Sequence, residues 1–181
     1  MKATGIVRRI DDLGRIVIPK EIRRTMRIRE GDPLEIFTDK DGIVIFKKYS
    51  QMGELSEFAE NYVEAIQKVS GYPTAIVDKD AVIAVSGVAK KDLLEKNISS
   101  EISEVLEDRM TYGYMEGDEH SIPLLNSTDK YRVNIACPIV SQGEPIGAVV
   151  IFSSDQVQNL GEMEEKIAQT SATVLGKMLD V

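Results

Sequence analysis

Apolar residues recur every three or four positions in two stretches of the chain, a spacing that predicts amphipathic helices. The first stretch runs from Leu55 to Val69 and stops before Gly71 and Pro73, two residue types that end helices. The second stretch, residues 156–178, has a spacing close to a heptad repeat. Its stripe consists of Leu160, Met163, Ile167, Thr170, Val174 and Met178. If these stripes are wider than one sheet can cover, the helices pair with the same helices of another subunit.

Short runs of β-branched and aliphatic residues predict strands elsewhere in the chain. In the first part the expected strands are 5–10, 15–18, 34–38 and 43–48, with a helical turn at 19–26 between the two hairpins. In the second part they are 74–77, 81–85, 131–140, 146–152 and some of the polar segment 115–125. Residues 89–110 are expected to form one or two short helices, with Ser99 or Ser100 as a cap. This order predicts an α+β fold with one antiparallel sheet, one face of which carries the first and last helices.

The lengths of these segments predict two domains. Residues 1–50 contain too little material for an independent core, and the chain has no pair of cysteines to compensate. We therefore expect the strands of two chains to interleave, which makes the protein a dimer through residues 1–50. Residues 51–55 are the expected linker, and residues 56–181 are the expected second domain.

The net charge of −8 conceals an uneven distribution. Residues 1–50 hold 12 Lys and Arg against 8 Asp and Glu, a net charge of +4, whereas residues 51–181 carry −12. Such an imbalance indicates that one end of the chain faces nucleic acid. No apolar run approaches the ~20 residues that a membrane span needs. We expect a cytoplasmic protein whose partner is double-stranded DNA rather than a membrane.

The positive side chains flank a corner between a predicted strand and the helical turn that Pro19 begins. The candidate DNA contacts are Arg8, Arg9, Arg15, Lys20, Arg23 and Arg24. Guanidinium groups bridge phosphates or read guanine edges. An arginine cluster also occurs as a plain solvated surface, but this one occupies the net-positive part of an acidic chain. The nearby Asp11, Asp12 and Glu21 are expected to form ion pairs that orient the arginines, rather than a carboxylate pair for acid–base chemistry.

The segment from Thr4 to Arg24 resembles the N-terminal domain of the AbrB transition-state regulators of bacilli, and the similarity extends to about Tyr49. This resemblance implies a swapped-hairpin barrel in which two chains interlock and bind DNA as a dimer. The DNA-contacting arginines of that family fall on Arg8, Arg15, Arg23 and Arg24, with Arg9 at the following basic position.

The rest of the chain resembles a GAF domain, including the sequence Pro-Ile-Gly-Ala-Val-Val at residues 145–150. The two-domain order resembles regulators of sporulation that activate and repress forespore genes. The helical stripes at both ends of this domain favour a dimer of dimers, which makes the protein a homotetramer. The resemblance allows a second role, the sensing of a small molecule, because GAF domains bind varied small molecules or none. The region that commonly roofs a GAF ligand pocket falls on Tyr112, Tyr114, Met115 and His120. For each of these residues, core packing or a plain surface position is the alternative.

The sequence contains no motif for catalysis. A P-loop, a nucleotide-binding glycine fingerprint and a nucleophile elbow are all missing, and Cys137 and His120 each stand alone. We therefore expect no enzyme activity, no cofactor and no metal site. Two alternative functions stay open. One is an antitoxin-like protein-interaction module, which would use a disordered acidic tail, and the other is a GAF-based small-molecule sensor in which DNA binding is secondary.

Overall fold

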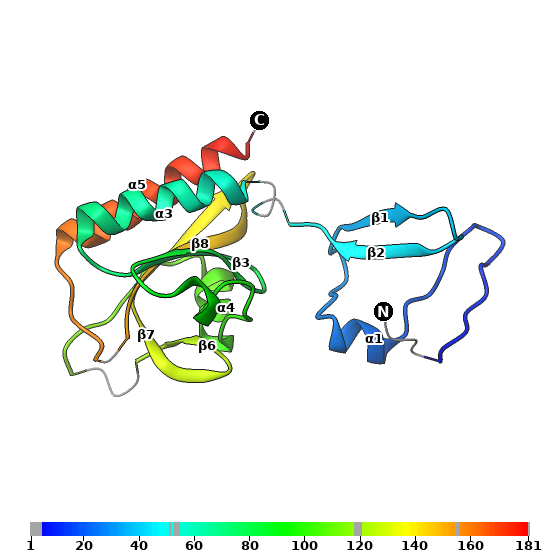
Figure 1. Ribbon diagram of the computed structural model, residues 1–181, viewed down its shortest axis with the longest axis horizontal. Coiled ribbons are helices and arrows are strands. Elements are labelled where there is room, and N and C mark those ends of the chain that lie inside the picture. The colour runs from blue at the N-terminus through cyan, green and yellow to red at the C-terminus, as the bar shows by residue number, and fades with distance from the viewer. Residues whose placement is uncertain (1–4, 51, 53–54, 118–120, 155, 181) are drawn as a thin grey trace. The chain divides into compact units, whose positions relative to one another are not determined.

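The computed structural model describes residues 5–50, 52, 55–117, 121–154 and 156–180. The chain divides into two compact units, Met1–Tyr49 and Ser50–Val181 (Figure 1). The boundary lies just before the predicted linker. Of that linker, Met52 and Leu55 are described, and the Met52 side chain is fully buried in the core of the second unit.

The first unit contains the predicted hairpin of β1 (Leu34–Thr38) and β2 (Val44–Lys48). The strands are antiparallel, and Ile36 lies opposite Phe46. The connecting turn is closed by the Gly42 amide, which donates to the Asp39 carbonyl oxygen at 3.3 Å, and Gly42 takes a φ of 77°. Glycine adopts this angle more easily than residues with a side chain, which is why an Asp-Gly pair is typical of hairpin turns. The Asp-Gly pair in the sequence therefore located this hairpin correctly.

The predicted helical turn is α1 (Lys20–Thr25), and it begins one residue later than expected because Pro19 is its N-cap. The Pro19 carbonyl oxygen accepts a hydrogen bond of 2.9 Å from the Arg23 amide. At the other end, the Ile28 amide donates to the Arg23 carbonyl oxygen at 2.8 Å, while Arg27 has a φ of 51°. This arrangement is a Schellman motif with arginine in the position that glycine usually takes.

The prediction of strands at residues 5–10 and 15–18 is wrong for a single chain. Among the described residues, neither segment belongs to a β-ladder, and the two are joined by a turn at residues 11–14. A strand requires a neighbour for its backbone hydrogen bonds, and apolar cover for one of its faces. Here Val7 and Val17 are 87% and 72% exposed, so the described residues of one chain do not cover these side chains.

The hairpin of the first unit is exposed on both faces as well. Large apolar side chains from β1 and β2 reach solvent, namely Ile36, Phe37, Val44, Ile45 and Phe46. The described residues 5–49 contribute no side chain to either hydrophobic core cluster. This part of the chain therefore has the apolar residues of a core without enclosing one.

The second unit contains an antiparallel sheet with the strand order β4-β3-β8-β7-β5, and β6 pairs with β7. The strands are β3 (Thr74–Asp78), β4 (Val82–Ser86), β5 (Tyr112–Gly113), β6 (Pro123–Leu125), β7 (Thr128–Ser141) and β8 (Glu144–Ser153). The single antiparallel sheet of the predicted α+β fold is thereby confirmed. The polar segment 115–125 contributes only β6, and residues 118–120 lie outside the described part.

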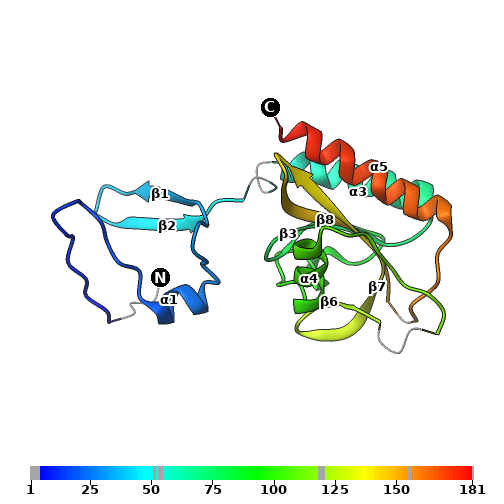
Figure 2. The same cartoon turned by 180° about the vertical axis from the view of Figure 1, so that it is seen from behind.

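Helices cover both faces of this sheet. The helices α3 (Ser56–Ser70) and α5 (Glu162–Met178) lie side by side on one face in both views (Figures 1 and 2). The opposite face carries α4 (Ser100–Asp108), which follows the short helix η1 (Lys90–Asp92). Of the two predicted caps, Ser99 and Ser100, the structure selects Ser99, whose Oγ accepts a hydrogen bond of 3.2 Å from the Ile102 amide.

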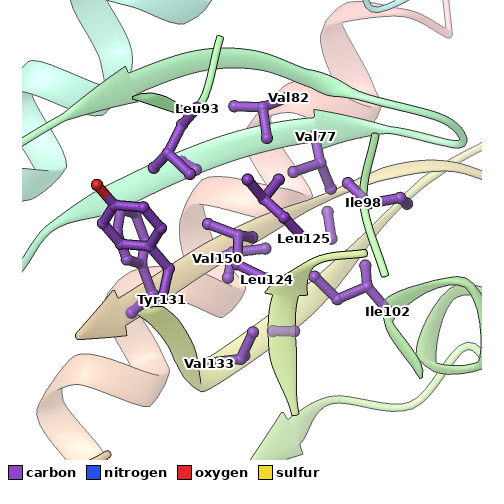
Figure 3. Close-up of a cluster of buried hydrophobic side chains, with 14 of the residues drawn as sticks. Val77, Val82, Leu93, Ile98, Ile102, Leu124, Leu125, Tyr131, Val133 and Val150 are labelled. Atoms are coloured by element: carbon purple, nitrogen blue, oxygen red, sulfur yellow. The ribbon is translucent and has the colours of Figure 1, made fainter. Parts of the chain in front are cut away.

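The sheet separates two hydrophobic cores, and successive residues of its strands contribute to them alternately. Ala75 and Val77 of β3 belong to the core on the α4 side, whereas Ile76 belongs to the core under α3 and α5. Figure 3 shows the first of these cores, where side chains from the sheet, α4 and the connecting loops point toward one another. Its labelled members include Leu93, Ile102, Leu124, Tyr131 and Val150.

The last helix begins at Glu162 rather than at residue 156, and a buried asparagine explains the difference. Asn134 lies at a bulge of β7 and is fully buried. Its side-chain amide donates to the Gln158 carbonyl oxygen at 2.9 Å, and its Oδ1 accepts from the Ser153 hydroxyl at 2.9 Å. Because Gln158 is held to the sheet in this way, the helix starts only after Gly161.

Candidate nucleic-acid interface

One of the candidate DNA contacts, Arg15, is held by the turn that precedes it. The Gly14 amide donates to the Asp11 carbonyl oxygen at 3.0 Å, and Gly14 has a φ of 76°. The Asp11 carboxylate accepts hydrogen bonds from the Leu13 and Arg15 amides at 3.0 and 2.8 Å, and from Arg15 Nε at 2.8 Å. The Arg15 amide and then its guanidinium lower the pKa of Asp11 from its ordinary value, so the carboxylate stays charged at neutral pH.

Three further candidates share one face of α1. Lys20 lies three and four residues before Arg23 and Arg24, and this spacing places the three side chains on neighbouring positions of a helix. All three residues are exposed, whereas Ile22 is half-buried. The structure therefore brings Lys20, Arg23 and Arg24 together on a single cationic surface.

Arg8 and Arg9 are located on the segment before the turn, and both are exposed. Six candidates thus lie on three pieces of the first unit: the segment at residues 5–10, the turn that ends at Arg15, and α1. Each piece is short and has little apolar burial.

Two residues that the sequence analysis did not single out hold α1 next to the hairpin. Lys48, at the end of β2, donates from Nζ to the Arg27 carbonyl oxygen at 3.0 Å and lies 3.3 Å from Asp32 Oδ2. Asp32 also accepts from the Arg29 amide at 2.8 Å. Burial opposes ionisation of Asp32, but the bonds from Arg29 and Lys48 outweigh it and lower its pKa. The Gly31-Asp32-Pro33 turn was visible in the sequence, but its contact with a lysine 16 residues away was not.

The predicted ligand-pocket residues of the second unit have different environments. Tyr112 is half-buried and packs against the core on the α4 side, Tyr114 is half-buried, and Met115 is 66% exposed. His120 lies outside the described residues. A groove on this unit lies elsewhere, along α5, with a volume of about 570 Å³. Its lining residues are Glu162, Met163, Lys166, Ile167, Thr170 and Ser171.

Reactive and metal-binding chemistry has little support in the described part of the chain. The Cys137 thiol is buried beneath α5, and burial raises its pKa although Thr111 lies within hydrogen-bonding distance at 3.4 Å. The described residues hold no group of three His, Cys, Asp or Glu side chains placed to bind a metal ion. None of the described helices has the length and apolar character needed to cross a membrane.

The combination of a small, arginine-rich β-hairpin unit and a larger α+β unit is that of a two-domain transcription regulator. Residues 7–53 match the family described as antidote-toxin recognition MazE, bacterial antitoxin. In the same region the chain is 59% identical over 49 residues to the transition state regulatory protein AbrB of Bacillus subtilis (strain 168), covering 27% of this chain and 50% of that protein.

Similarity over the whole chain defines the family. Residues 54–180 match the family described as stage V sporulation protein T C-terminal, transcription factor. Over 184 aligned residues, 99% of each chain, the protein is 53% identical to stage V sporulation protein T of Bacillus subtilis (strain 168). The chain therefore belongs to the stage V sporulation protein T family of transcription factors.

The fold of the second unit also agrees with the predicted GAF domain. The GAF domain of a phosphoenolpyruvate-protein phosphotransferase from Coxiella burnetii superposes with a TM-score of 0.54. It is 19% identical in sequence and covers 68% of this chain and 80% of that chain. At this identity the similarity identifies the fold.

Proposed function

We propose that this sporulation regulator binds duplex DNA as a dimer through its first unit and that its GAF-like unit joins dimers into a tetramer. The DNA contacts are Arg8, Arg9, Arg15, Lys20, Arg23 and Arg24. The observation that carries the proposal is the cationic face of α1. Lys20, Arg23 and Arg24 are exposed there, in a part of the chain with a net charge of +4, while the rest of the chain carries −12. DNA attracts the first unit and repels the second.

The dimer follows from the apolar side chains that one chain leaves uncovered. Val7 and Val17 are largely exposed, as are the apolar residues of β1 and β2. A unit of this size does not keep so large an apolar surface in water, because covering it contributes about 25 cal/mol per Å². A second copy of the same segment supplies the missing strand neighbours and the missing cover at once. In such a dimer every arginine occurs twice, as a two-fold DNA site requires.

The role of α1 is tested by fluorescence anisotropy with labelled duplex DNA over a series of salt concentrations. The wild type is compared with an Arg23→Ala/Arg24→Ala variant of unchanged oligomeric state. We expect weaker binding and a log–log salt slope that is shallower by about 0.9 for each lost phosphate contact. The matched control is Lys91→Ala/Lys96→Ala, which removes two exposed positive charges from the second unit.

The two variants separate a DNA-binding face from a general charge effect. If Arg23→Ala/Arg24→Ala and Lys91→Ala/Lys96→Ala weaken binding to the same extent, net charge alone is responsible and α1 is not the contact surface. Binding curves identical to those of the wild type would mean that the arginines of α1 form an ordinary solvated surface.

The match of residues 7–53 to an antitoxin family favours one rival function, that of a protein-interaction module. A module of that kind would use a disordered acidic tail to hold its partner. Here residues 56–180 form a sheet with helices on both faces, apart from the few residues outside the described part. Limited proteolysis discriminates the two functions. A protease-resistant fragment spanning residues 55–181 supports the regulator, and rapid degradation of that region supports the antitoxin-like module.

The proposed function involves no catalytic step. It places the protein in the cytoplasm, where its DNA target lies. Burial raises the pKa of the Cys137 thiol and makes it a poor nucleophile, and the family that matches residues 54–180 is described as a transcription factor. Sensing of a small molecule near Tyr112, Tyr114, Met115 and His120 is a subordinate part of the proposal. A ligand that raises the melting temperature of the wild type but not of a Tyr114→Ala variant would support it.

A further inference from the structure

The two oxygens of the Asp11 carboxylate serve different purposes. Oδ1 accepts hydrogen bonds from the Leu13 and Arg15 amides and so closes the turn. Oδ2 accepts from Arg15 Nε at 2.8 Å and so holds the arginine side chain. The contacts of Oδ1 fix the backbone of the turn. The contact of Oδ2 orients the Arg15 guanidinium, which binds DNA in the proposed function.

The contact with Asp11 leaves most of the guanidinium available. Arginine has five N–H donors, and Asp11 occupies only the one on Nε. The other four are on the two terminal nitrogens, at the far end of a side chain that is 68% exposed. Two nitrogens in this arrangement match a pair of adjacent acceptors, either O6 and N7 of a guanine or two phosphate oxygens.

We propose that Asp11 is a positioning residue for DNA recognition, which holds Arg15 by Nε so that the guanidinium meets DNA through its two terminal nitrogens. This inference rests on the proposed DNA-binding function. An exposed arginine loses rotamer freedom when it binds, and a side chain that is already held loses less. The contact also occupies the Nε donor. DNA acceptors therefore cannot bind the guanidinium through Nε and one terminal nitrogen.

The Asp11→Asn variant separates the two purposes of the carboxylate. Asparagine keeps one oxygen that accepts from the Leu13 and Arg15 amides, but it places an NH₂ group where Oδ2 accepts from Nε. The matched control is Asp12→Asn. The sequence predicted an orienting ion pair for Asp12 as well, but Asp12 is exposed and takes part in none of the hydrogen bonds that join the described residues of this turn. Both variants remove one negative charge, so both increase the general attraction to DNA equally.

Two duplexes are titrated by fluorescence anisotropy: one selected by the wild type from a random-sequence pool, and a shuffled duplex of the same composition. We expect Asp12→Asn to bind both duplexes as tightly as the wild type or more tightly. Asp11→Asn should bind the selected duplex about fivefold to twentyfold more weakly, given the worth of an exposed charge pair and its presence in both chains of a dimer. A loss confined to the selected duplex assigns the terminal nitrogens to guanine, and an equal loss on both assigns them to phosphate.

Combination with Arg15→Ala shows whether Asp11 acts through Arg15. In the Arg15→Ala background, Asp11→Asn should cause no further loss of affinity, because there is no guanidinium left to position. A further loss of the same size would mean that Asp11 only shapes the turn, and the inference would be overturned. It would also be overturned if Asp11→Asn bound like Asp12→Asn, or if Arg15→Ala bound like the wild type. The proposed function is judged separately, by the Arg23→Ala/Arg24→Ala variant.

Discussion

At the scale of single residues, several polar side chains connect parts of the chain that have few apolar contacts. Asp11 holds a turn, Asp32 and Lys48 hold the end of α1, and Asp180 holds the end of the chain. Asp180 accepts hydrogen bonds of 2.7 Å from the Ser141 hydroxyl and from the Gln142 amide. These two donors lower the pKa of Asp180 below 3.8, its ordinary value.

A pH dependence of stability follows from Asp180. Because its folded-state pKa lies below the unfolded value of 3.8, the carboxylate stabilises the fold at pH values above 3.8. That contribution is lost as the pH falls through the folded-state pKa. Asparagine can still accept both hydrogen bonds, so Asp180→Asn removes the charge alone. We expect the wild type to be the more stable at pH 7 in urea denaturation, and the two proteins to converge in acid. A constant difference at every pH would contradict this assignment.

At the scale of elements, α5 packs unusually closely on β7. A Cβ atom at Gly176 would lie well inside contact distance of the Val140 carbonyl oxygen, so glycine permits this approach. Leu175 and Ala172 on the same helix are buried in the core beneath it. The position of α5 therefore depends on the absence of a side chain at one residue.

This packing reverses the usual effect of replacing glycine in a helix. Alanine normally stabilises a helix by about 1 kcal/mol relative to glycine. We expect Gly176→Ala to destabilise the second unit by about 1–3 kcal/mol instead, because the added methyl group forces α5 away from β7. Urea denaturation followed by circular dichroism measures the change. Thr173→Ala, at an exposed position of the same helix, is the control and should be neutral or slightly stabilising.

At the scale of the whole molecule, both units leave apolar surface that one chain does not cover. In the first unit it is the hairpin and the segments before α1. In the second unit this apolar surface is a stripe on α5, next to the groove that Ile167 lines. The stripe includes Met163, which is 62% exposed, and Val174, which is 38% exposed. The proposed dimer of dimers would use these two separate surfaces.

The stripe on α5 predicts a change of oligomeric state. A charge placed at Val174 would have to be buried in a helix-to-helix contact, which costs several kcal/mol when the charge has no partner. We expect light scattering to show a tetramer for the wild type and a dimer for Val174→Glu. Thr173→Glu adds the same charge at the neighbouring exposed position of α5, which is not part of the apolar stripe. This variant should remain tetrameric. A wild type that is only dimeric at micromolar concentration would contradict the proposed tetramer.

Local patterns were enough to predict most elements of the second unit. The apolar spacing between Leu55 and Val69 identified α3, Ser99 identified the start of α4, and runs of β-branched residues identified β3, β4, β7 and β8. These signals act within a few residues, because a helical face, a cap or a strand is specified by neighbours in the sequence. The Asp-Gly pair located the hairpin of the first unit for the same reason.

The sequence by itself determined the two-part charge distribution, the elements of the second unit and the identity of the candidate DNA contacts. Only the tertiary structure decided which distant polar side chains meet. The contacts of Lys48 with Asp32, of Asn134 with Gln158 and of Asp180 with Ser141 join residues 16 to 39 positions apart, and no local pattern encodes them. The segments around Arg8 and Arg15 have strand-forming sequences, yet strands require neighbours, and the described chain provides none for them.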